Sequence, residues 1–308
     1  MNKFDIAGHR NLFFLISALL IIAGIACMCV RGFNFGIDFT GGTIMDVAFE
    51  RPVSIAEVRT SLGRYGLEGS TIQLSGETGG ATDAATAENV MIRTVDLEEE
   101  QRKEVMASLK TDVADYQVMR EEKVGATIGG ELITNAVLAL VISWALIILY
   151  IAYRFEWRFG VAAVIALVHD ILIVLGIFAF TQRQIDSSFI AALMTIVGYS
   201  LNDTIVIFDR IRENLKLHFR RGGNIDKLVN TSIFQTLTRS LYTVFTVLFT
   251  TFALYFFGGD TTKDFSFALL IGFSIGCYSS IFIASPLWIV LRNYGSKKHS
   301  AAKAAAAE

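Results

Sequence analysis

The stretch Phe189–Phe208, FIAALMTIVGYSLNDTIVIF, decides the fold of this chain. It is long and apolar enough to form a membrane-spanning helix, which needs about 20 mainly apolar residues. It also contains Asp203, and an ionisable side chain inside a bilayer is usually kept only where it faces a partner, a cavity or a proton path. The alternative is a structural role, in which a hydrogen-bonded Asp ties helices together. Asp203 therefore makes this helix the first candidate functional element.

The remainder of the chain is also rich in long apolar segments. Apolar residues make up 53% of the 308 residues, and Pro occurs only 2 times. Five more segments have the length and composition of a span: Leu12–Val30, Leu132–Tyr153, Phe159–Phe180, Leu241–Phe257 and Phe265–Leu291. The sequence therefore predicts a polytopic α-helical membrane protein with six transmembrane helices. The first segment could be a signal peptide, but its long apolar stretch and the lack of a following A-x-A site favour a retained anchor.

The distribution of Lys and Arg predicts the orientation of the six helices. Basic residues gather at the two ends of the chain and in two alternate loops: Lys3, Arg10, Arg154, Arg158, Arg210, Arg212, Lys216, Arg220, Arg221, Lys227, Arg292, Lys297 and Lys298. The other short loops carry only Arg183 and Lys263. Because positive charge stays in the cytoplasm, both termini are expected to be cytoplasmic. The net charge of −2 gives no electrostatic reason to expect nucleic acid as a partner.

The long connection between the first two spans, residues 31–131, has the size and pattern of an extracytoplasmic domain. The predicted elements, in order, are a strand Thr43–Glu50, a helix from the capping box Ser54–Glu57 to Leu62, a strand Ser70–Ser75, a loop Gly76–Glu88, a strand Asn89–Val95, a helix from the cap Asp96 to Lys110 and a strand Tyr116–Glu121. This β-α-β-β-α-β order predicts an α+β ferredoxin-like domain. The chain thus divides into residues 1–30, the domain 31–131, a five-helix bundle 132–292 and a tail 293–308.

No enzyme signature is present in the sequence. Phosphate-loop, zinc-protease and nucleophile-elbow motifs are missing, and the turn Gly41–Gly42 is too short to indicate a phosphate site. Cys27, Cys29 and Cys277 lie in predicted spans, where packing is their expected role. Without an ATP-binding motif, any work must draw on another source, and the membrane potential offers about 2.3 kcal/mol per charge per 100 mV.

Five polar residues inside the predicted spans are candidates for proton coupling. Asn202 and Asp203 lie in the cytoplasmic half of the fourth span, and Arg239 lies at the predicted start of the fifth, so that an Asp203–Arg239 ion pair is possible. Loss of that partner in a dry site would favour the protonated carboxyl, as a proton carrier requires. A static salt bridge that only fixes helix packing is the alternative. For His169 and Asp170, in the third span, structural and functional roles remain equally open.

Several long motifs give the chain a family resemblance. Phe35–Thr43, FGIDFTGGT, which contains Asp38, Gly41 and Gly42, resembles the signature of the SecD/SecF membrane proteins. Val197–Asn214, VGYSLNDTIVIFDRIREN, and Gln235–Ser240, QTLTRS, resemble the SecF branch of that family. The resemblance extends from about residue 4 to 292 and leaves out the alanine-rich tail.

The resemblance implies a function in protein export. It implies a subunit in the bacterial cell (inner) membrane that pairs with SecD, works beside the SecY channel and uses the proton-motive force to move unfolded secreted polypeptides outward. It implies that Asp203 and Arg239 are the proton-linked residues. No cofactor is expected, nucleic acid is not an expected partner, and the coupling ion is H⁺ with Na⁺ left open. A self-sufficient small-molecule exporter of the same superfamily, and a scaffold without transport, are the alternatives.

Overall fold

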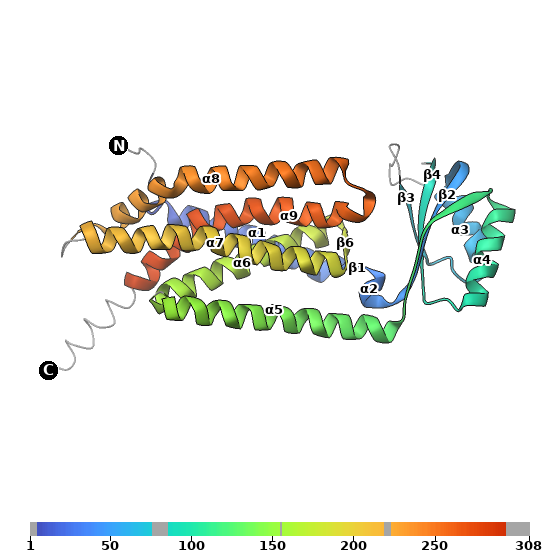
Figure 1. Ribbon diagram of the computed structural model, residues 1–308, viewed down its shortest axis with the longest axis horizontal. Coiled ribbons are helices and arrows are strands. Elements are labelled where there is room, and N and C mark those ends of the chain that lie inside the picture. The colour runs from blue at the N-terminus through green and yellow to red at the C-terminus, as the bar shows by residue number, and fades with distance from the viewer. Residues whose placement is uncertain (1–4, 76–85, 155, 219–222, 294–308) are drawn as a thin grey trace. The chain divides into compact units, whose positions relative to one another are not determined.

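The computed structural model describes residues 5–75, 86–154, 156–218 and 223–293. The chain forms two compact units, one of residues 1–34 and 138–308 and the other of residues 35–137. The first contains most of the membrane-helix residues, and the second contains a four-stranded sheet with two helices packed on it (Figure 1). Each unit is described by itself below.

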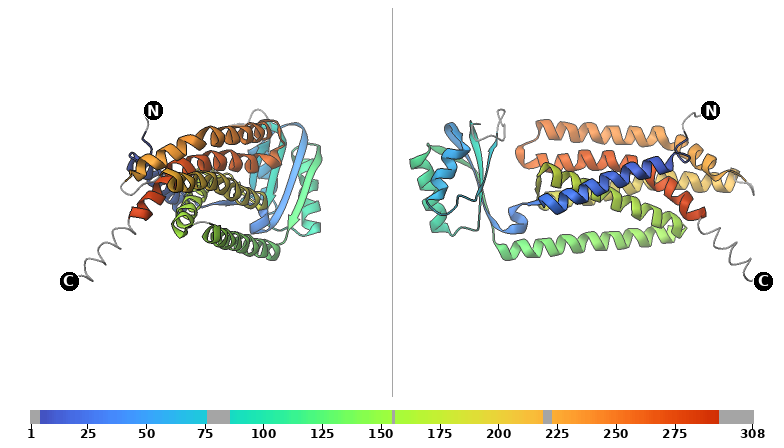
Figure 2. Two further views of the ribbon diagram at one scale, coloured as in Figure 1. Left: turned by 60° about the vertical axis from the view of Figure 1, so that its left-hand side comes forward. Right: turned by 180° about the vertical axis from the view of Figure 1, so that it is seen from behind.

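Six helices within the described residues are long and apolar enough to cross a membrane, as the sequence predicts. They are α1 (Arg10–Arg31), α5 (Ala126–Arg154), α6 (Trp157–Thr181), α7 (Ser187–His218), α8 (Ile225–Phe257) and the span Thr262–Asn293. The last span consists of α9 (Asp260–Ser279), a π-helical turn η1 (Ser280–Ala284) and a final helical stretch over residues 285–293. Figure 2 shows α1 and α6 to α9 as one bundle.

Two of these helices are longer than the apolar segments that predict them. Helix α7 continues ten residues beyond Phe208, and α8 begins at Ile225 instead of Leu241, so Arg239 lies inside α8 and not at its start. The side chain of Asn224 caps α8 by accepting a hydrogen bond from the Lys227 N–H at 3.0 Å. Hydropathy misses these extensions because they are amphipathic and their polar side chains pair with each other.

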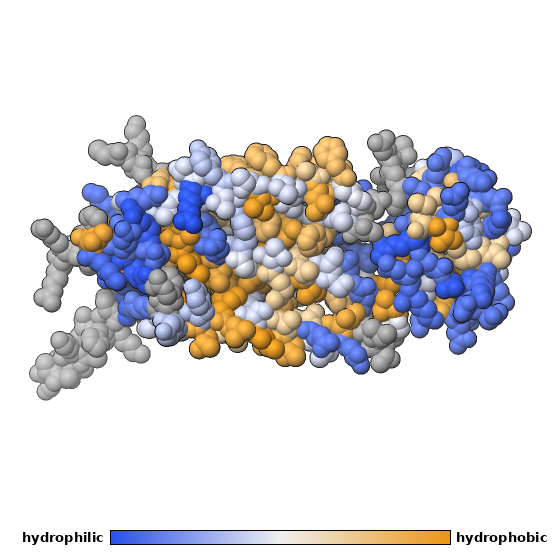
Figure 3. All heavy atoms as spheres, viewed as in Figure 1, coloured by the Kyte–Doolittle hydropathy of each residue, from blue (hydrophilic) through white to orange (hydrophobic). Residues whose placement is uncertain are grey.

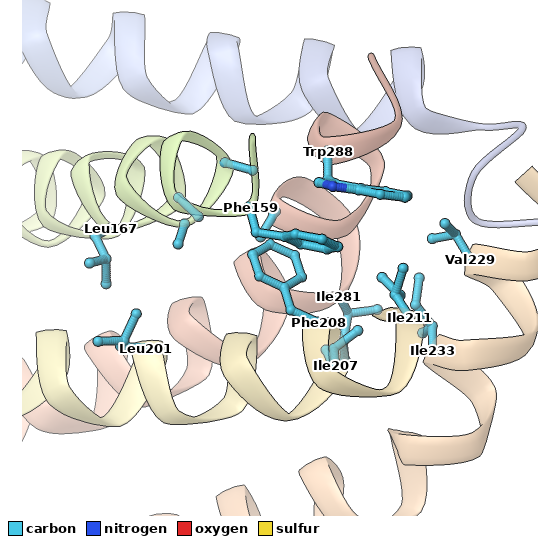
Figure 4. Packing of buried hydrophobic residues seen from close by; sticks show 14 of the residues in the cluster. Phe159, Leu167, Leu201, Ile207, Phe208, Ile211, Val229, Ile233, Ile281 and Trp288 are labelled. Atoms are coloured by element: carbon cyan, nitrogen blue, oxygen red, sulfur yellow. The ribbon is translucent and has the colours of Figure 1, made fainter. Parts of the chain in front are cut away.

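The core of the bundle is apolar and aromatic. Phe159 stacks on Trp288 with ring centroids 4.7 Å apart and also contacts Phe208 at 4.9 Å (Figure 4). Leu167, Leu201, Ile207, Ile211, Val229, Ile233 and Ile281 pack around them in the same cluster. Figure 3 shows hydrophobic residues over the middle of the helices and hydrophilic ones at the end near the α7–α8 connection. This band of exposed apolar side chains is what a membrane-spanning surface requires.

Glycines allow two pairs of helices to approach closely. A Cβ atom at Gly276 of α9 would lie 2.9 Å from the Ser200 Cβ of α7, and one at Gly272 would lie 2.2 Å from Ile196 Cδ1. On α6, a Cβ at Gly176 would lie 2.7 Å from the Gly24 Cα of α1. Small residues at such crossings are the usual device of membrane helix packing.

The second unit has the predicted ferredoxin-like order. Its elements are β2 (Gly42–Ser54), α3 (Ile55–Gly63), β3 (Thr71–Ser75), β4 (Thr86–Thr94), α4 (Glu99–Asp112) and β5 (Tyr116–Val124). The four strands form an antiparallel sheet in the order β3-β4-β2-β5. Helices α3 and α4 lie on one face of it (Figures 1 and 2), where a core that includes Met45, Leu62 and Leu109 is fully buried. The short elements β1 (Asn34–Phe35), α2 (Ile37–Thr40) and β6 (Gln184–Ile185) complete the described elements.

Two details of this unit differ from the prediction. Asp96 does not cap α4, because the helix begins at Glu99 with Glu98 at its N-cap and a capping box between Glu98 and Gln101. Leu97 is buried in the domain core, which keeps the chain extended for two more residues, and Asp96 pairs with Lys123 at 3.0 Å. Residues 86–88 of the predicted loop belong to β4, and residues 76–85 lie outside the described residues.

The Gly41–Gly42 pair at the start of β2 is required by backbone geometry. Gly41 has a φ of 69° and Gly42 a φ of 142°, which side chains with a Cβ rarely adopt. A Cβ at Gly42 would also lie 2.5 Å from the Thr94 carbonyl oxygen on β4. Asp38 lies in the first turn of α2, directly before this turn. The predicted turn at these two residues is confirmed, and its tightness explains why both are glycine.

The β-α-β-β-α-β unit, expressed alone as residues 42–124, is expected to fold. Ser54 Oγ accepts from the Glu57 N–H at 3.2 Å, and Glu57 Oε2 accepts from the Ser54 N–H at 3.0 Å. That second bond holds the pKa of Glu57 below its usual range, so its small contribution to stability is lost as the pH falls through that lowered pKa.

Ser54→Ala is expected to lower the free energy of unfolding of this unit by about 1 kcal/mol, measured by urea denaturation. Thr60→Ala, at an exposed position of the same helix, is the control and should change the free energy of unfolding little. A circular dichroism spectrum of a random coil for the isolated unit would contradict the expectation that it folds.

Candidate functional site

Asp170 of α6 is a buried carboxylate with hydrogen bonds to both of its oxygens. Its side chain is 1% exposed. Its Oδ1 lies 2.9 Å from His169 Nδ1, and its Oδ2 accepts hydrogen bonds from Ser200 at 2.6 Å and Ser279 at 2.9 Å. Asp170 therefore joins α6, α7 and α9 at one point. A buried carboxylate needs such a set of donors, because an unpaired one is very costly in an apolar environment.

His169 extends this group of hydrogen bonds to α1. Its Nδ1 bonds Asp170, and its Nε2 lies 3.0 Å from Ser17 Oγ. Ser17 in turn lies 3.3 Å from the hydroxyl of Tyr278 on α9. Although adjacent helical residues point about 100° apart, His169 and Asp170 bond each other directly. The two residues whose roles the sequence leaves open thus form one buried pair.

Asp203 lies one turn from Ser200 on α7 and differs from Asp170 in its bonding. It is 8% exposed. Its Oδ1 accepts a hydrogen bond from Ser240 of α8. Its Oδ2 is buried, and no hydrogen-bond partner for it is found in the part of the chain that the structure describes. Asp203 is therefore a buried carboxylate with one oxygen, Oδ2, that has no described hydrogen-bond partner, which we call its open oxygen.

A row of hydroxyl groups fills the space between α7 and the last span. Thr204 Oγ1 lies 2.8 Å from Ser280 Oγ, and Ser280 also donates to the Ser200 carbonyl oxygen at 3.3 Å. Ser200, Asp203 and Thr204 share one face of α7 because they are three and four residues apart. The π-helical turn begins at Ser280, and such turns occur frequently at functional sites. The close approach at Gly276 is what brings the serines of α9 within reach of α7.

Arg239 and Asn202 are not part of this buried group. Both are exposed on the isolated chain, next in sequence to Ser240 and Asp203 respectively. Among the described ion pairs there is none between Asp203 and Arg239, because Ser240 occupies the position that faces Asp203. The signature residues Asp38, Gly41 and Gly42 lie in the other unit. The structure therefore brings together His169 and Asp170, places Asp203 nearby on α7, and puts Arg239 beside Asp203's partner.

Several residues of the site escape sequence reasoning: Ser17, Ser200, Thr204, Ser240, Tyr278, Ser279 and Ser280. Their hydroxyl groups barely change hydropathy, so they leave the apolar signal of a span intact. The available signal is the spacing of Ser200, Asp203 and Thr204, together with the expectation that small polar residues hydrogen-bond across membrane helices. The structure describes no cluster of three or more His, Cys, Asp or Glu side chains arranged for a metal ion.

Comparisons with known proteins identify the family of the chain. The family model described as "Protein export membrane protein SecD/SecF, C-terminal" matches residues 104–294, and the "SecD/SecF GG Motif" model matches residues 28–53. A protein translocase subunit SecF from Acidaminococcus fermentans is 49% identical over 95% of this chain and 98% of its own. The SecF subunit from Vibrio alginolyticus is 41% identical over 90% of this chain and 86% of its own.

A solved structure is similar along almost the whole chain. The crystal structure of SecDF, a translocon-associated membrane protein from Thermus thermophilus, has a TM-score of 0.83 and 37% identity. The similarity covers 95% of this chain and 39% of the SecDF chain. A SecDF structure in the super-membrane-facing form gives a TM-score of 0.71 and 36% identity. The six apolar helices, the glycine turn and these matches show that the chain is a multi-pass membrane protein of the SecD/SecF protein-export family and belongs to its SecF branch.

Proposed function

We propose that the chain couples proton flow to protein export as one half of a SecD–SecF unit. In this proposal it lies in the bacterial cell (inner) membrane with both termini in the cytoplasm. With SecD it uses the proton-motive force to help unfolded secreted polypeptides leave the SecY channel. The single observation that carries the proposal is Asp203, a buried carboxylate with one open oxygen inside a membrane span. Protein export is preferred to the alternative of a self-sufficient small-molecule exporter because the chain belongs to the SecF branch of the protein-export family.

The bonding of Asp203 supports its role as a proton acceptor. Ser240 already donates to Oδ1, so Oδ2 is the oxygen on which a proton can be taken up without breaking a hydrogen bond. Once protonated, the carboxyl is neutral and can itself donate to an acceptor, so its bonding requirement reverses. Arg239, on the neighbouring position of α8, is the charge that a rotation of that helix would bring toward ionised Asp203. Such alternation between two partners is what a proton-driven cycle needs.

The orientation and energy source follow from charge. Basic residues at alternate ends of the helices support cytoplasmic termini. The proton is proposed as the coupling ion because Asp203 Oδ2, which has no hydrogen-bond partner among the described residues, can take up a proton. The test is translocation in vesicles that hold this chain with SecD and SecY, driven by an imposed proton gradient. A sodium gradient in parallel vesicles separates the two coupling ions, and export of small molecules by the chain alone would favour the alternative function.

Two exposed stripes support a partner that covers this face. On α7, Ala191, Thr195, Gly198 and Asn202 are exposed at intervals of three or four residues. On α8, exposed polar residues follow the same interval: Gln235, Arg239, Thr243, Thr246 and Thr250. Polar side chains at membrane depth are costly when they face lipid. The stripes flank the Asp203–Ser240 contact, so a partner that covers them would close the proposed proton site, and membrane lipid would contact the apolar surface elsewhere.

Arg239→Ala is expected to reduce proton-driven translocation at least tenfold, and Arg239→Lys less, because Lys keeps the charge but lacks the planar fork. The measurement is the initial rate of translocation in the same vesicles. Arg212→Ala is the control, since Arg212 pairs with Asp209 at the end of α7 and away from Asp203. Wild-type rates for both Arg239 variants would contradict a role of Arg239 in proton coupling.

A further inference from the structure

Ser17 is the one buried residue among those of α1, and it is polar. The other side chains of this helix are exposed or half-buried, as expected for an apolar helix at the edge of a bundle. Packing alone would bury an apolar residue at the contact, because a hydroxyl group must find partners there. The burial of Ser17 therefore points to its hydrogen bonds.

Those hydrogen bonds place Ser17 between two titratable side chains. Its Oγ lies 3.0 Å from His169 Nε2 and 3.3 Å from the Tyr278 hydroxyl. The Tyr278 hydroxyl also donates to the Phe13 carbonyl oxygen of α1 at 3.3 Å. On the other side, His169 Nδ1 bonds Asp170. The result is a continuous chain of hydrogen bonds from Asp170 to the backbone of α1.

This series of hydrogen bonds is continuous in both charge states of His169. With a neutral ring, Nδ1–H donates to Asp170 and the Ser17 hydroxyl donates to Nε2. With a charged ring, Nε2–H donates to Ser17 Oγ, and the Ser17 hydrogen turns to the oxygen of Tyr278, which continues to donate to Phe13. A serine hydroxyl serves both states because it donates, accepts and rotates. Alanine would leave Nε2 without this partner in each of them.

The surroundings make Ser17 the adjustable member of the chain. Asp170 is held on its far side by Ser200 and Ser279 and cannot turn without losing them. The Gly24–Gly176 contact lies seven residues further along both α1 and α6, about 10 Å away at 1.5 Å per residue, and it fixes the distance between these helices. Of the titratable groups on the packed helices, Asp203 and Cys277 make no described hydrogen bond to His169 or Ser17.

We propose that Ser17 is a positioning residue that allows the buried His169–Asp170 pair to take up and release a proton. It acts through His169 by supplying the partner that Nε2 needs in each charge state. This proposal rests on the proposed proton-coupled function, but it concerns a different helix and a different carboxylate from Asp203. It makes α1, which precedes the sheet domain in the sequence, a helix whose hydrogen bonds change with the charge of His169.

The first test is spectroscopic and does not depend on transport. The full chain, labelled with ¹⁵N-histidine and placed in liposomes, contains four His, and His169→Gln identifies the signals of His169. Ser17→Ala is expected to shift the Nε2 resonance and change its response to pH, whereas Ser17→Thr, which keeps the hydroxyl, should leave both close to wild type. Ser274→Ala is the matched control, because the hydrogen bond described for its hydroxyl is to the Leu270 carbonyl oxygen of its own helix. An unchanged His169 spectrum in Ser17→Ala would overturn the proposal.

The second test measures proton-driven translocation. Ser17→Ala is expected to slow it about tenfold, as loss of a hydrogen bond to a charged group implies, and Ser17→Thr to restore most of the rate. Because Ser17 acts through His169, adding Ser17→Ala to His169→Gln should cause no further loss. Fully additive effects, or a wild-type rate for Ser17→Ala, would overturn the inference. If wild-type vesicles show no proton-driven translocation, the proposed function fails, and the spectroscopic test still decides the role of Ser17.

Discussion

Asp203→Asn is expected to reduce proton-driven translocation to the background of vesicles that lack this chain. Asn has the same shape and keeps an oxygen for the Ser240 hydroxyl, so the α7–α8 contact should survive. It cannot bind and release a proton, so the open Oδ2 position loses its proposed function. The measurement is the rate of polypeptide translocation under an imposed proton gradient. The thermal stability of the variant and the amount of it that is purified in complex with SecD should change little, because the substitution adds no charge or volume to the core.

Asp209→Asn supplies the control for this result. Asp209 is on the same helix, but it is exposed and pairs with Arg212 at 2.6 Å. The same chemical change there should leave translocation near wild type, since exposed ion pairs contribute little. Wild-type rates for Asp203→Asn in assembled vesicles would contradict the proton-acceptor role. Loss of assembly together with activity would instead support the structural alternative, in which Asp203 ties α7 to α8.

The sequence predicts the membrane helices well for a physical reason. A span must satisfy its backbone internally and present apolar side chains to lipid, so it leaves a long local signal. Helix ends outside the bilayer obey other rules. The α7 and α8 extensions are stabilised by contacts such as Arg210–Gln235 at 2.6 Å and Asn214–Ser232 at 2.8 Å. These pairs join residues from different helices, and no window along one helix can reveal them.

The candidate site is only partly visible in the sequence. Charged residues such as Asp170 and Asp203 stand out in an apolar span, but their partners do not. Ser17 meets His169 across 152 positions of sequence, and Ser240 meets Asp203 across 37. In this structure the residue of α8 that contacts Asp203 is Ser240 and not its neighbour Arg239, so the Asp203–Arg239 ion pair is not formed. Adjacent positions on a helix face different directions. Depth in the membrane can be estimated from the sequence, whereas the rotation of a helix is set by packing.

Cysteines on the exposed stripe of α7 are expected to crosslink to SecD in membranes. Gly198 is the best position, because a Cβ atom there meets nothing within 4 Å and the substitution should not disturb the fold. The stripe continues to Asn202, directly beside Asp203. In the proposed SecD–SecF unit, SecD supplies the other side of the proton site. Native Cys27, Cys29 and Cys277 are free thiols and would be replaced first.

The control for this experiment is Leu19→Cys on α1, which is 58% exposed and lies on a helix that contributes nothing to the two stripes. If SecD covers the α7–α8 face, Gly198→Cys should crosslink to cysteines on SecD and Leu19→Cys should not. The physical reason is that Arg239 and Asn202 avoid the cost of facing lipid only when this face is covered. Crosslinks that form only between copies of this chain would show that it covers its own polar face as an oligomer. Efficient crosslinking through Leu19 but not Gly198 would mean that SecD docks elsewhere and that the open oxygen of Asp203 lies outside the interface.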